Sequence, residues 1–233
     1  MVNFLLLIRH TESTKNKKRQ LASSESQEML TSKGVIQASV LAEQIALFID
    51  AKGLFVQQVY CANSRRAIDT GRIIASKLNL DVNVVVCNEF LSFNVGTFAG
   101  SSEKRISKVN PIFTDNLRLY RKGVVNSYDI IYGGTKQLLQ DYEESIKTRL
   151  NLIIKQNNKT NFKTCVIVVM HRSALTATFL DIAREFYSYP NEFYGYIGMN
   201  IGTLSLISID ENNTKRFELL CENPKKLLKI YDD

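Results

Sequence analysis

The sequence predicts an α/β protein, a three-layer α/β/α sandwich with a mostly parallel central sheet and an antiparallel edge strand. Apolar, β-branched runs of strand length recur along the chain, and amphipathic helical periods lie between them. Strands that alternate with helices favour a parallel sheet covered on both faces. Near the end of the chain, two strand-like runs flank the turn-rich tetrapeptide Asp210 to Asn213, which favours an antiparallel hairpin at one edge of the sheet.

The strand candidates differ in length and in apolar character. Those apolar enough to be buried on both faces are Phe4 to Ile8, Val82 to Cys87 and Thr164 to Val169. The shorter candidates, which include the two strands of the hairpin, are Val56 to Tyr60, Thr203 to Ile209 and Arg216 to Cys221. We expect all of these segments to join one sheet.

The helix candidates are defined by apolar residues that recur every three or four positions. The clearest stripe consists of Val35, Ala38, Leu41, Ala42, Ile45, Phe48 and Ile49. Thr31 is a plausible cap in front of it. A second stripe consists of Leu138, Leu139, Tyr142, Ile146, Leu150 and Ile153, and a third helix is expected from Ser64 to Leu78.

The chain has the composition of a single globular domain. Its 233 residues are 45% apolar and 23% charged, and no repeat of fixed period or linker-like tract divides them. We therefore expect one domain over residues 1–233. The apolar start, Phe4 to Ile8, is too short for a secretory leader or a membrane span, which favours a cytoplasmic protein that does not bind membranes.

The sequence offers few side chains for a metal site, whereas its net positive charge favours the binding of anions. Four cysteines form no CxxC pair and only two histidines are present, so we expect reduced structural thiols and no dedicated metal site. Thirty Lys and Arg against 23 Asp and Glu give a formal net charge of +7. Much of it lies in Lys15 to Arg19 and Arg118 to Lys122, and composition alone does not choose among nucleic acid, anionic lipid and a phosphorylated metabolite.

The two histidines of the chain each follow a predicted core strand directly. His10 comes after the strand that starts at Phe4, and His171 comes after the strand that starts at Thr164. In an open parallel sheet, ligands bind outside the carboxyl ends of the strands, near the point where the strand order reverses. We therefore expect both imidazoles to project into one crevice.

The residues around His10 resemble the opening motif of the histidine phosphatase, or phosphoglycerate mutase-like, superfamily, which is Arg-His-Gly-Glu-Ser/Thr-x-x-Asn. This chain has Arg9-His10-Thr11-Glu12-Ser13-Thr14-Lys15-Asn16, with Thr11 in place of the glycine. Further matches follow in the family's order: Leu30-Thr31 with Gly34, Gln37-Ala38 and Leu41-Ala42, then Arg66-Ala67 with Thr70, then Gly96 to Gly100, then Tyr132-Gly133-Gly134. His171 stands where the family has its second histidine. The resemblance spans roughly residues 3 to 210.

This resemblance implies a metal-independent phosphatase that needs no cofactor and works through a phosphohistidine. It makes His10 the nucleophile, and it gives Arg9, Arg66 and His171 the task of holding the phosphoryl group and stabilising its charge. Arginine forks grip phosphate oxygens in bidentate fashion. Neighbouring cations also disfavour the imidazolium, which keeps His10 nucleophilic.

The remaining site assignments concern the substrate. We assign Asn16, which fits the family's phosphate-contacting asparagine, together with Thr11 and Arg172, to substrate binding. A segment from about 95 to 134 is expected to form a lid over the site. The expected partner is a small phosphorylated metabolite, with a second anionic group if the basic clusters line the mouth.

The family's usual general acid is missing from its expected place. The family protonates the leaving oxygen with a glutamate four residues before the glycine of its Gly-x-Trp turn, and counting back from Gly96 lands on Ser92. A serine is a poor proton donor near neutral pH. We expect Glu89 to reach the same place if Phe90 to Val95 forms a short insertion. An absent acid is the alternative, and Glu103 and Glu12 are weaker candidates.

Two other functions stay open, and a third is disfavoured. A phosphate-binding pseudo-enzyme would explain the unusual residues Thr11, Ser92 and Arg172, and a phosphoglycerate mutase would return the phosphoryl group to its substrate instead of passing it to water. Nucleic-acid binding is disfavoured because the basic segments lack interleaved aromatic side chains and match no nucleic-acid-reading motif. The sequence leaves open whether the chain forms a homodimer.

Overall fold

A six-stranded sheet lies at the centre of the structure. The computed structural model describes residues 3–18, 20–21, 27–81, 83–121, 139–157, 163–186, 200–210, 212 and 214–222. The strands are β1 (Asn3–Arg9), β2 (Phe55–Ala62), β3 (Val85–Cys87), β4 (Thr164–Met170), β5 (Leu204–Ile209) and β6 (Lys215–Glu222). Their order is β3-β2-β4-β1-β5-β6, and among these strands only the pairs that β5 makes are antiparallel. The predicted fold class is confirmed.

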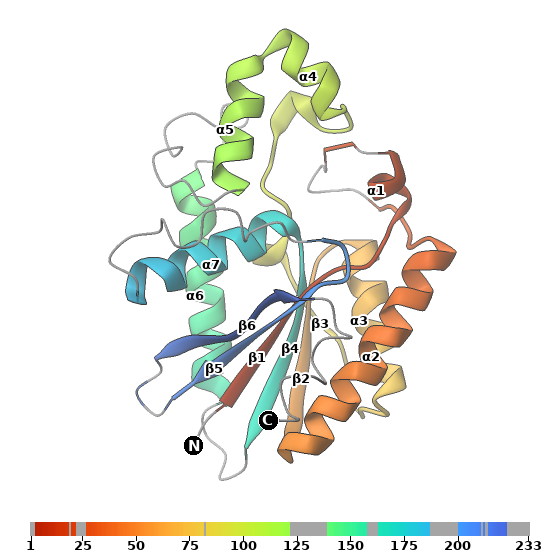
Figure 1. Cartoon of the computed structure of the whole chain (residues 1–233), viewed down its shortest axis with the longest axis vertical. Helices are drawn as coiled ribbons and strands as arrows, with labels where there is room; N and C mark the ends of the chain where they lie inside the picture. Colours follow the sequence, from red (N-terminus) through yellow and green to blue (C-terminus); the bar gives the residue numbers. More distant parts are fainter. Residues whose placement is uncertain are drawn as a thin grey trace.

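Four long helices cover the two faces of this sheet. They are α2 (Ser32–Lys52), α3 (Arg65–Lys77), α6 (Leu139–Asn157) and α7 (Arg172–Phe186). Figure 1 shows α2 and α3 on one side of the sheet and α6 and α7 on the other. Right-handed crossovers explain this division. The connections from β1 to β2 and from β2 to β3 run toward one edge of the sheet and place α2 and α3 on one face. The connection from β3 to β4 runs in the opposite direction and places α6 on the other face.

Several short helices lie beyond the carboxyl ends of the parallel strands. They are α1 (Thr14–Lys18), α4 (Glu103–Val109) and α5 (Pro111–Arg121), and Figure 1 shows α1 on one side of this end of the sheet with α4 and α5 above it. Single 3₁₀ turns, η1 (Asn88–Phe90) and η2 (Gly96–Phe98), connect β3 to α4. The expected lid at 95–134 therefore contains η2, α4 and α5, and its residues 122–134 lie outside the described part of the chain.

The central strands are apolar because both of their faces are covered. Every residue of β4 is buried, and Leu6, Leu7 and Ile8 of β1 have no exposed surface. The edge strand β3 differs from the expectation of a buried strand from Val82. It starts only at Val85, pairs with β2 alone and leaves Val86 45% exposed, while Val82 itself lies outside the described residues.

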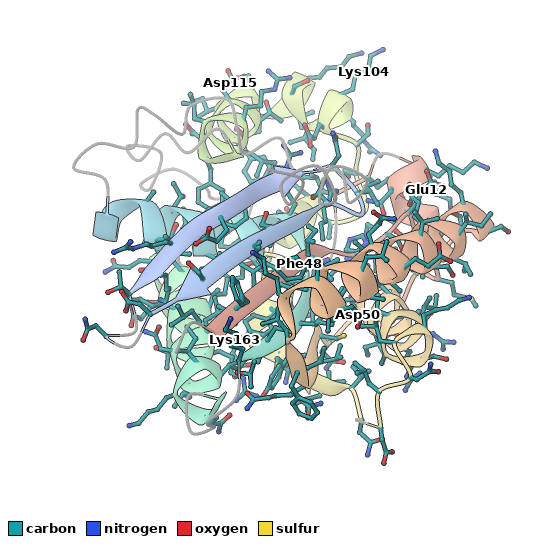
Figure 2. The ribbon with its side chains drawn as sticks, turned by 60° about the horizontal axis from the view of Figure 1, so that its bottom comes forward. Glu12, Phe48, Asp50, Lys104, Asp115 and Lys163 are labelled. Carbon is teal, nitrogen blue, oxygen red and sulfur yellow. The ribbon has the colours of Figure 1, made fainter. Side chains whose placement is uncertain are left out.

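Helix α2 carries the clearest predicted stripe, with one correction. Leu41, Ile45 and Phe48 are buried, and Figure 2 shows Phe48 where α2 faces the sheet. Val35, which the periodicity placed on the buried face, is 44% exposed. Gly34 lies on that face instead, because the first turn of the helix packs directly against the backbone of Glu12.

Among the described helices, α2 is long and apolar enough to cross a membrane, judged by length and composition alone. The core helices of soluble proteins often share these two properties.

The first turn of α2 clamps the loop that follows β1. Thr31 caps the helix by accepting a hydrogen bond from the Gly34 N–H at 3.0 Å, and the Thr31 N–H donates to the Glu12 carbonyl at 3.0 Å. The side chain of Gln37 accepts from the Glu12 N–H at 3.0 Å. These contacts explain the Thr31, Gly34 and Gln37 pattern, because each residue fixes the backbone two positions after His10.

Replacing Gly34 by alanine should destabilise the fold, because a Cβ at this position would overlap the carbonyl oxygen of Glu12. We expect Gly34→Ala to lower the free energy of unfolding by about 1–3 kcal/mol, although alanine favours a helix over glycine. Urea unfolding measures the change. The control Glu43→Ala, at an exposed position of the same helix, should stay within about 0.5 kcal/mol of the wild type. Equal stability of Gly34→Ala and the wild type would contradict the close packing.

Only part of the expectations for the cysteines, the glycine pair and the second helical stripe falls within the described residues. Cys61, Cys87 and Cys165 are buried and free, as expected for reduced structural thiols, and the side chain of Cys221 lies outside the described residues. The Tyr132-Gly133-Gly134 element and the start of the second helical stripe at Leu138 also lie outside them.

Candidate active site

The two histidines lie side by side at the carboxyl ends of β1 and β4. These strands are parallel neighbours, and the His10 N–H donates to the Met170 carbonyl at 3.1 Å, directly before His171. The chain leaves β1 toward α2 and leaves β4 toward α7, on opposite faces, so this is a switch point of the sheet. Both rings are buried, with centroids 5.0 Å apart and planes at 72°.

The hydrogen bonds of His10 fix where its lone pair lies. Its Nδ1 is 2.8 Å from the Thr11 carbonyl, and its Nε2 is 3.2 Å from the Nε of Arg66. A carbonyl only accepts and a guanidinium only donates, so Nδ1 carries the hydrogen and Nε2 carries the lone pair. A neutral imidazole held in this tautomer presents Nε2 as a nucleophile.

His171 is oriented by the first turn of α3. Its Nδ1 is 3.4 Å from an Nη of Arg66, so Nδ1 accepts and Nε2 carries the hydrogen. That Nε2 lies 3.0 Å from the Ser64 hydroxyl. Ser64 is the N-cap residue of α3, yet its side chain makes no capping hydrogen bond. The hydroxyl is used to hold the imidazole instead.

Arg66 connects the two histidines electrostatically as well as by contact. Burial is the main cause that holds the pKa of His10 well below 6.5, and the charges of Arg66 and Arg9 lower this pKa further. The hydrogen bond to the Thr11 carbonyl acts in the opposite direction. Burial and the same cations act likewise on the pKa of His171. Burial lowers the pKa of Arg66 itself to about 10, and the carboxylate of Glu28 opposes that change. Arg66 therefore remains a cation at neutral pH.

These shifts predict the acid limb of the pH profile. The protonated imidazole is not nucleophilic, and a lowered pKa keeps His10 neutral to lower pH. We expect kcat/KM for p-nitrophenyl phosphate, corrected for ionisation of the substrate, to stay level as the pH falls through 6.5 and to decline only well below it. Initial rates across this range measure the profile. A decline centred at 6.5 or above would contradict the shift.

A cavity of about 910 Å³ opens above the two histidines. Its lining cations are Arg9, Lys15, Lys18, Lys33, Arg66, Lys104 and Arg172. The basic run at 15–19 thus contributes Lys15 and Lys18, while Arg19 lies outside the described residues. Of the second basic run, Arg118 pairs with Asp115 on the surface at 3.1 Å and is not part of the cavity lining. Figure 2 shows Asp115 and Lys104 on the separate helices α5 and α4.

Main-chain hydrogen bonds join the segment after α1 to the segment before α4 across one side of this cavity. The Leu21 N–H donates to the Ser101 carbonyl at 2.9 Å, and the Gly100 N–H donates to the Leu21 carbonyl at 3.0 Å. Gly100 adopts a φ of 78°, which glycine accepts readily. The glycine-rich turn from Gly96 to Gly100 therefore ties α4 to α1, and Lys104 and Lys18 both line the enclosed space.

The residues assigned to substrate binding occupy different places. Asn16 lines the cavity, and its Oδ1 accepts from the N–H and hydroxyl of Ser13 at 3.0 and 2.7 Å, which orients the amide. Arg172, the first residue of α7, also lines the cavity. Thr11 does not: it is fully buried and its N–H and hydroxyl both contact the Thr70 hydroxyl at 3.2 Å. Thr11 therefore holds the loop that carries His10.

Glu89 is not brought to this cavity, which corrects the expectation that it replaces the missing acid. Strand β3 ends at Cys87, and η1 turns Glu89 into a separate groove formed with α6, beside Glu144 and Arg149. Ser92 is the residue of this segment that lines the histidine cavity together with Phe93 and Val95. The segment from Phe90 to Val95 therefore does not redirect the carboxyl.

Two carboxylates are found in the described lining of the cavity, Glu12 and Glu103. The carboxylate of Glu12 accepts from the Thr31 hydroxyl at 2.8 Å and lies 3.7 Å from the ammonium of Lys33. Figure 2 shows Glu12 beside the amino end of α2. Glu103 is the first residue of α4. Neither occupies the segment in which the family carries its acid.

Sequence reasoning missed a chain of ion pairs beside Arg66. Glu28 contacts an Nη of Arg66 at 3.3 Å through Oε2 and the ammonium of Lys15 at 3.3 Å through Oε1. Lys15 is only 5% exposed, whereas the sequence showed it only as one member of the basic run from Lys15 to Arg19. A buried lysine needs a partner, but nothing in the local sequence indicates which acidic residue supplies it.

Comparison with known proteins identifies the family of this chain. The family model of the histidine phosphatase superfamily (branch 1) matches residues 5–222. A curated relative, the 2,3-bisphosphoglycerate-dependent phosphoglycerate mutase of Thermoplasma acidophilum, is 39% identical over 77 residues, which are 33% of this chain and 36% of the relative. The chain thus matches about a third of the length of that relative.

Solved structures share the whole fold at low identity. Phosphoglycerate mutase from Bacillus anthracis superposes with a TM-score of 0.76 and 16% identity, covering 98% of this chain and 96% of that one. A mycobacterial glucosyl-3-phosphoglycerate phosphatase gives 0.72 and 14%, covering 96% and 100%. These likenesses show the fold, and the family match extends over nearly the whole sequence. The chain therefore belongs to the histidine phosphatase superfamily, branch 1.

Proposed function

We propose that this protein hydrolyses phosphomonoesters of small metabolites through a phosphohistidine at His10, without a metal ion. The observation that carries the proposal is the position of the His10 Nε2 lone pair, 3.2 Å from the Arg66 Nε on the floor of a cationic cavity. Phosphoryl transfer asks the protein chiefly for positioning and charge stabilisation, and this arrangement supplies both.

The proposed reaction has two steps. In the first, Nε2 of His10 attacks the phosphorus and the bond to the leaving oxygen breaks, while Arg9, Arg66 and His171 stabilise the charge on the phosphoryl oxygens. The Nδ1 hydrogen bond to the Thr11 carbonyl stabilises the phosphorylated ring. In the second step, water attacks the phosphohistidine, phosphate leaves and His10 is restored. In this scheme the amide of Asn16, which lines the cavity, contacts a phosphoryl oxygen.

The size and charge of the cavity support a substrate with a second anionic group. Beyond the histidines, Lys18 of α1, Lys33 of α2 and Lys104 of α4 line the cavity. Lysines from three elements around one space attract a carboxylate or second phosphate on the same metabolite. The proposed substrate class is therefore a phosphorylated acid or a bisphosphate, acted on in the cytosol.

Two other functions are favoured by specific observations. The similarity to a phosphoglycerate mutase in one third of the chain favours transfer of the phosphoryl group back to the substrate. The serine at position 92 favours a protein that binds phosphate groups but turns them over poorly. The proposed hydrolysis differs from both in releasing inorganic phosphate over many turnovers.

Phosphate release in the presence of EDTA tests the proposal. We expect the wild-type chain to hydrolyse p-nitrophenyl phosphate with EDTA present, and to prefer phosphomonoesters that carry a second anionic group over neutral alkyl phosphates. Conversion of 3-phosphoglycerate to its isomer faster than release of phosphate would favour the mutase. Tight vanadate binding with no turnover of any ester would leave the phosphate-binding function.

A further inference from the structure

Among the described residues, no carboxylate stands in the segment where the family carries its acid, because Glu12 follows β1 and Glu103 begins α4. The reaction needs a proton donor for ordinary substrates. An alkoxide leaving group departs slowly unless a positioned acid protonates it, whereas p-nitrophenolate leaves without help. Ser92 stands where the acid is expected, and Glu89 lies in another groove. The carboxylate of Glu12 is engaged by Thr31 and Lys33.

Lys15 is a buried proton-bearing group in the wall of the same cavity. Its side chain is 6% exposed, and it precedes Asn16 on α1. Its ammonium is 3.3 Å from Oε1 of Glu28, and Oε2 of Glu28 is 3.3 Å from an Nη of Arg66. One carboxylate therefore separates Lys15 from the guanidinium that contacts the nucleophile.

We propose that Lys15 is the general acid of this enzyme and that Glu28 is the positioning residue that holds its ammonium beside the phosphoryl site. The inference rests on the proposed phosphatase function and names the missing donor. It requires the leaving oxygen to face Lys15 when the phosphoryl group is bound by Arg66 and the neighbouring Asn16.

Protons and charges balance in this scheme. As Nε2 of His10 forms its bond to phosphorus and the P–O bond breaks, Lys15 gives one proton to the leaving oxygen, so an alcohol departs and a neutral amine remains. That amine then takes a proton from the water that attacks the phosphohistidine. Hydrogen phosphate leaves, and the ammonium of Lys15 and the neutral ring of His10 are both restored.

The electrostatics of the wall support this assignment. Burial lowers the pKa of Lys15 and the charge of Arg66 lowers it further, whereas Glu28 raises it. A lysine with a lowered pKa is a stronger acid than one in water, and donors work best when their pKa approaches the working pH. The charged groups that act on Lys15 are Glu28 before α2 and Arg66 on α3, and the charge of Lys15 in turn lowers the pKa of His171 after β4.

Substitution by arginine separates proton donation from charge. Arginine keeps the cation and the partner Glu28, but its pKa lies well above that of lysine, so it is a far poorer proton donor at the working pH. We expect Lys15→Arg to lower kcat for an alkyl phosphate by about 100-fold and kcat for p-nitrophenyl phosphate by less than about threefold. The control is Lys17→Arg, an exposed position on the same helix outside the cavity lining, which should change neither rate.

A second measurement needs no variant. In the wild type, kcat/KM for the alkyl phosphate should fall with rising pH as Lys15 loses its proton, at a midpoint below the ordinary 10.5, while kcat/KM for p-nitrophenyl phosphate should not fall with it. Circular dichroism on Lys15→Arg establishes that its losses are not losses of fold. Glu28→Gln, which weakens the positioning of the ammonium, should also slow the alkyl ester selectively.

The outcomes distinguish this inference from the function on which it rests. An equal fall in rate on both esters in Lys15→Arg would overturn the role of Lys15. The same alkaline decline for both esters in the wild type would do so too. Either result would leave the phosphatase function intact. Wild-type hydrolysis of p-nitrophenyl phosphate with no hydrolysis of alkyl phosphates would also overturn the role of Lys15. A wild-type chain that hydrolyses neither ester would overturn the proposed function itself.

Discussion

Replacing His10 by alanine should reduce kcat for p-nitrophenyl phosphate by at least about 10⁴-fold, because the substitution removes the atom that attacks phosphorus in the proposed reaction. The activated leaving group needs no acid, so this substrate isolates the nucleophilic step. Stopped assays with EDTA present measure the rate, and vanadate binding reports whether the pocket survives. We expect the variant to retain vanadate binding, since Arg9 and Arg66 remain.

His171→Ala is the matched comparison for this prediction. The second imidazole lies 5.0 Å from the first. In the proposed reaction it stabilises charge without forming a bond to phosphorus. Its removal should cost about 10²- to 10³-fold in kcat, which is less than the loss in His10→Ala. Similar residual rates in the two variants would contradict a unique nucleophile at His10.

Replacing Arg66 by lysine should lower kcat/KM by about 10²- to 10³-fold even though the charge is kept. The guanidinium reaches His10 through Nε, His171 through one Nη and Glu28 through the other, and a single ammonium cannot reproduce this fork. The same kinetic assay on Arg65→Lys is the control. Arg65 is half exposed and pairs with Asp69 on the surface at 2.9 Å.

The pH profile of the rate is a second measurement for the Arg66→Lys prediction. A lysine ammonium also only donates, but it cannot contact both imidazoles as the fork does, so the pH profile of Arg66→Lys should differ in shape from that of the wild type. Arg65→Lys should match the wild type in both rate and profile. A loss of less than about tenfold in Arg66→Lys would show that charge alone suffices at this position.

The placement of the histidines was predictable because it depends on local patterns. Buried parallel strands appear as unbroken β-branched runs, and a residue that directly follows such a run lies at the carboxyl edge of the sheet. His10 and His171 both do so, and the structure brings their rings together. The helix that begins after Thr31 was equally readable from its period and cap.

The failures come from features that sequence spacing does not encode. Val35 fits the helical period, but the first turn of α2 packs on the Glu12 backbone, where glycine has to take the buried position. Glu89 lies three residues before the expected acid position, and the turn after β3 directs it toward α6 instead of the histidines. Side-chain direction in an irregular segment depends on tertiary contacts that periodicity does not report.

The ion pairs of Lys15 and Glu28 illustrate the same limit for the site. These residues are distant in sequence, belong to no repeating pattern and meet only because α1 and the segment before α2 both approach α3. The family motif leaves position 15 unspecified, so the resemblance gave no reason to single out this lysine. Its burial identified it, and burial is a property of the folded chain.

Direct detection of the covalent intermediate tests the central claim. The wild-type chain, mixed with a phosphomonoester in the presence of EDTA and quenched in alkali within the first turnovers, should carry one phosphoryl group on the peptide that contains His10. The adduct should be stable to alkali and labile to acid, as a phosphohistidine is. Rapid turnover with no adduct at His10, or an adduct on another residue, would contradict the account.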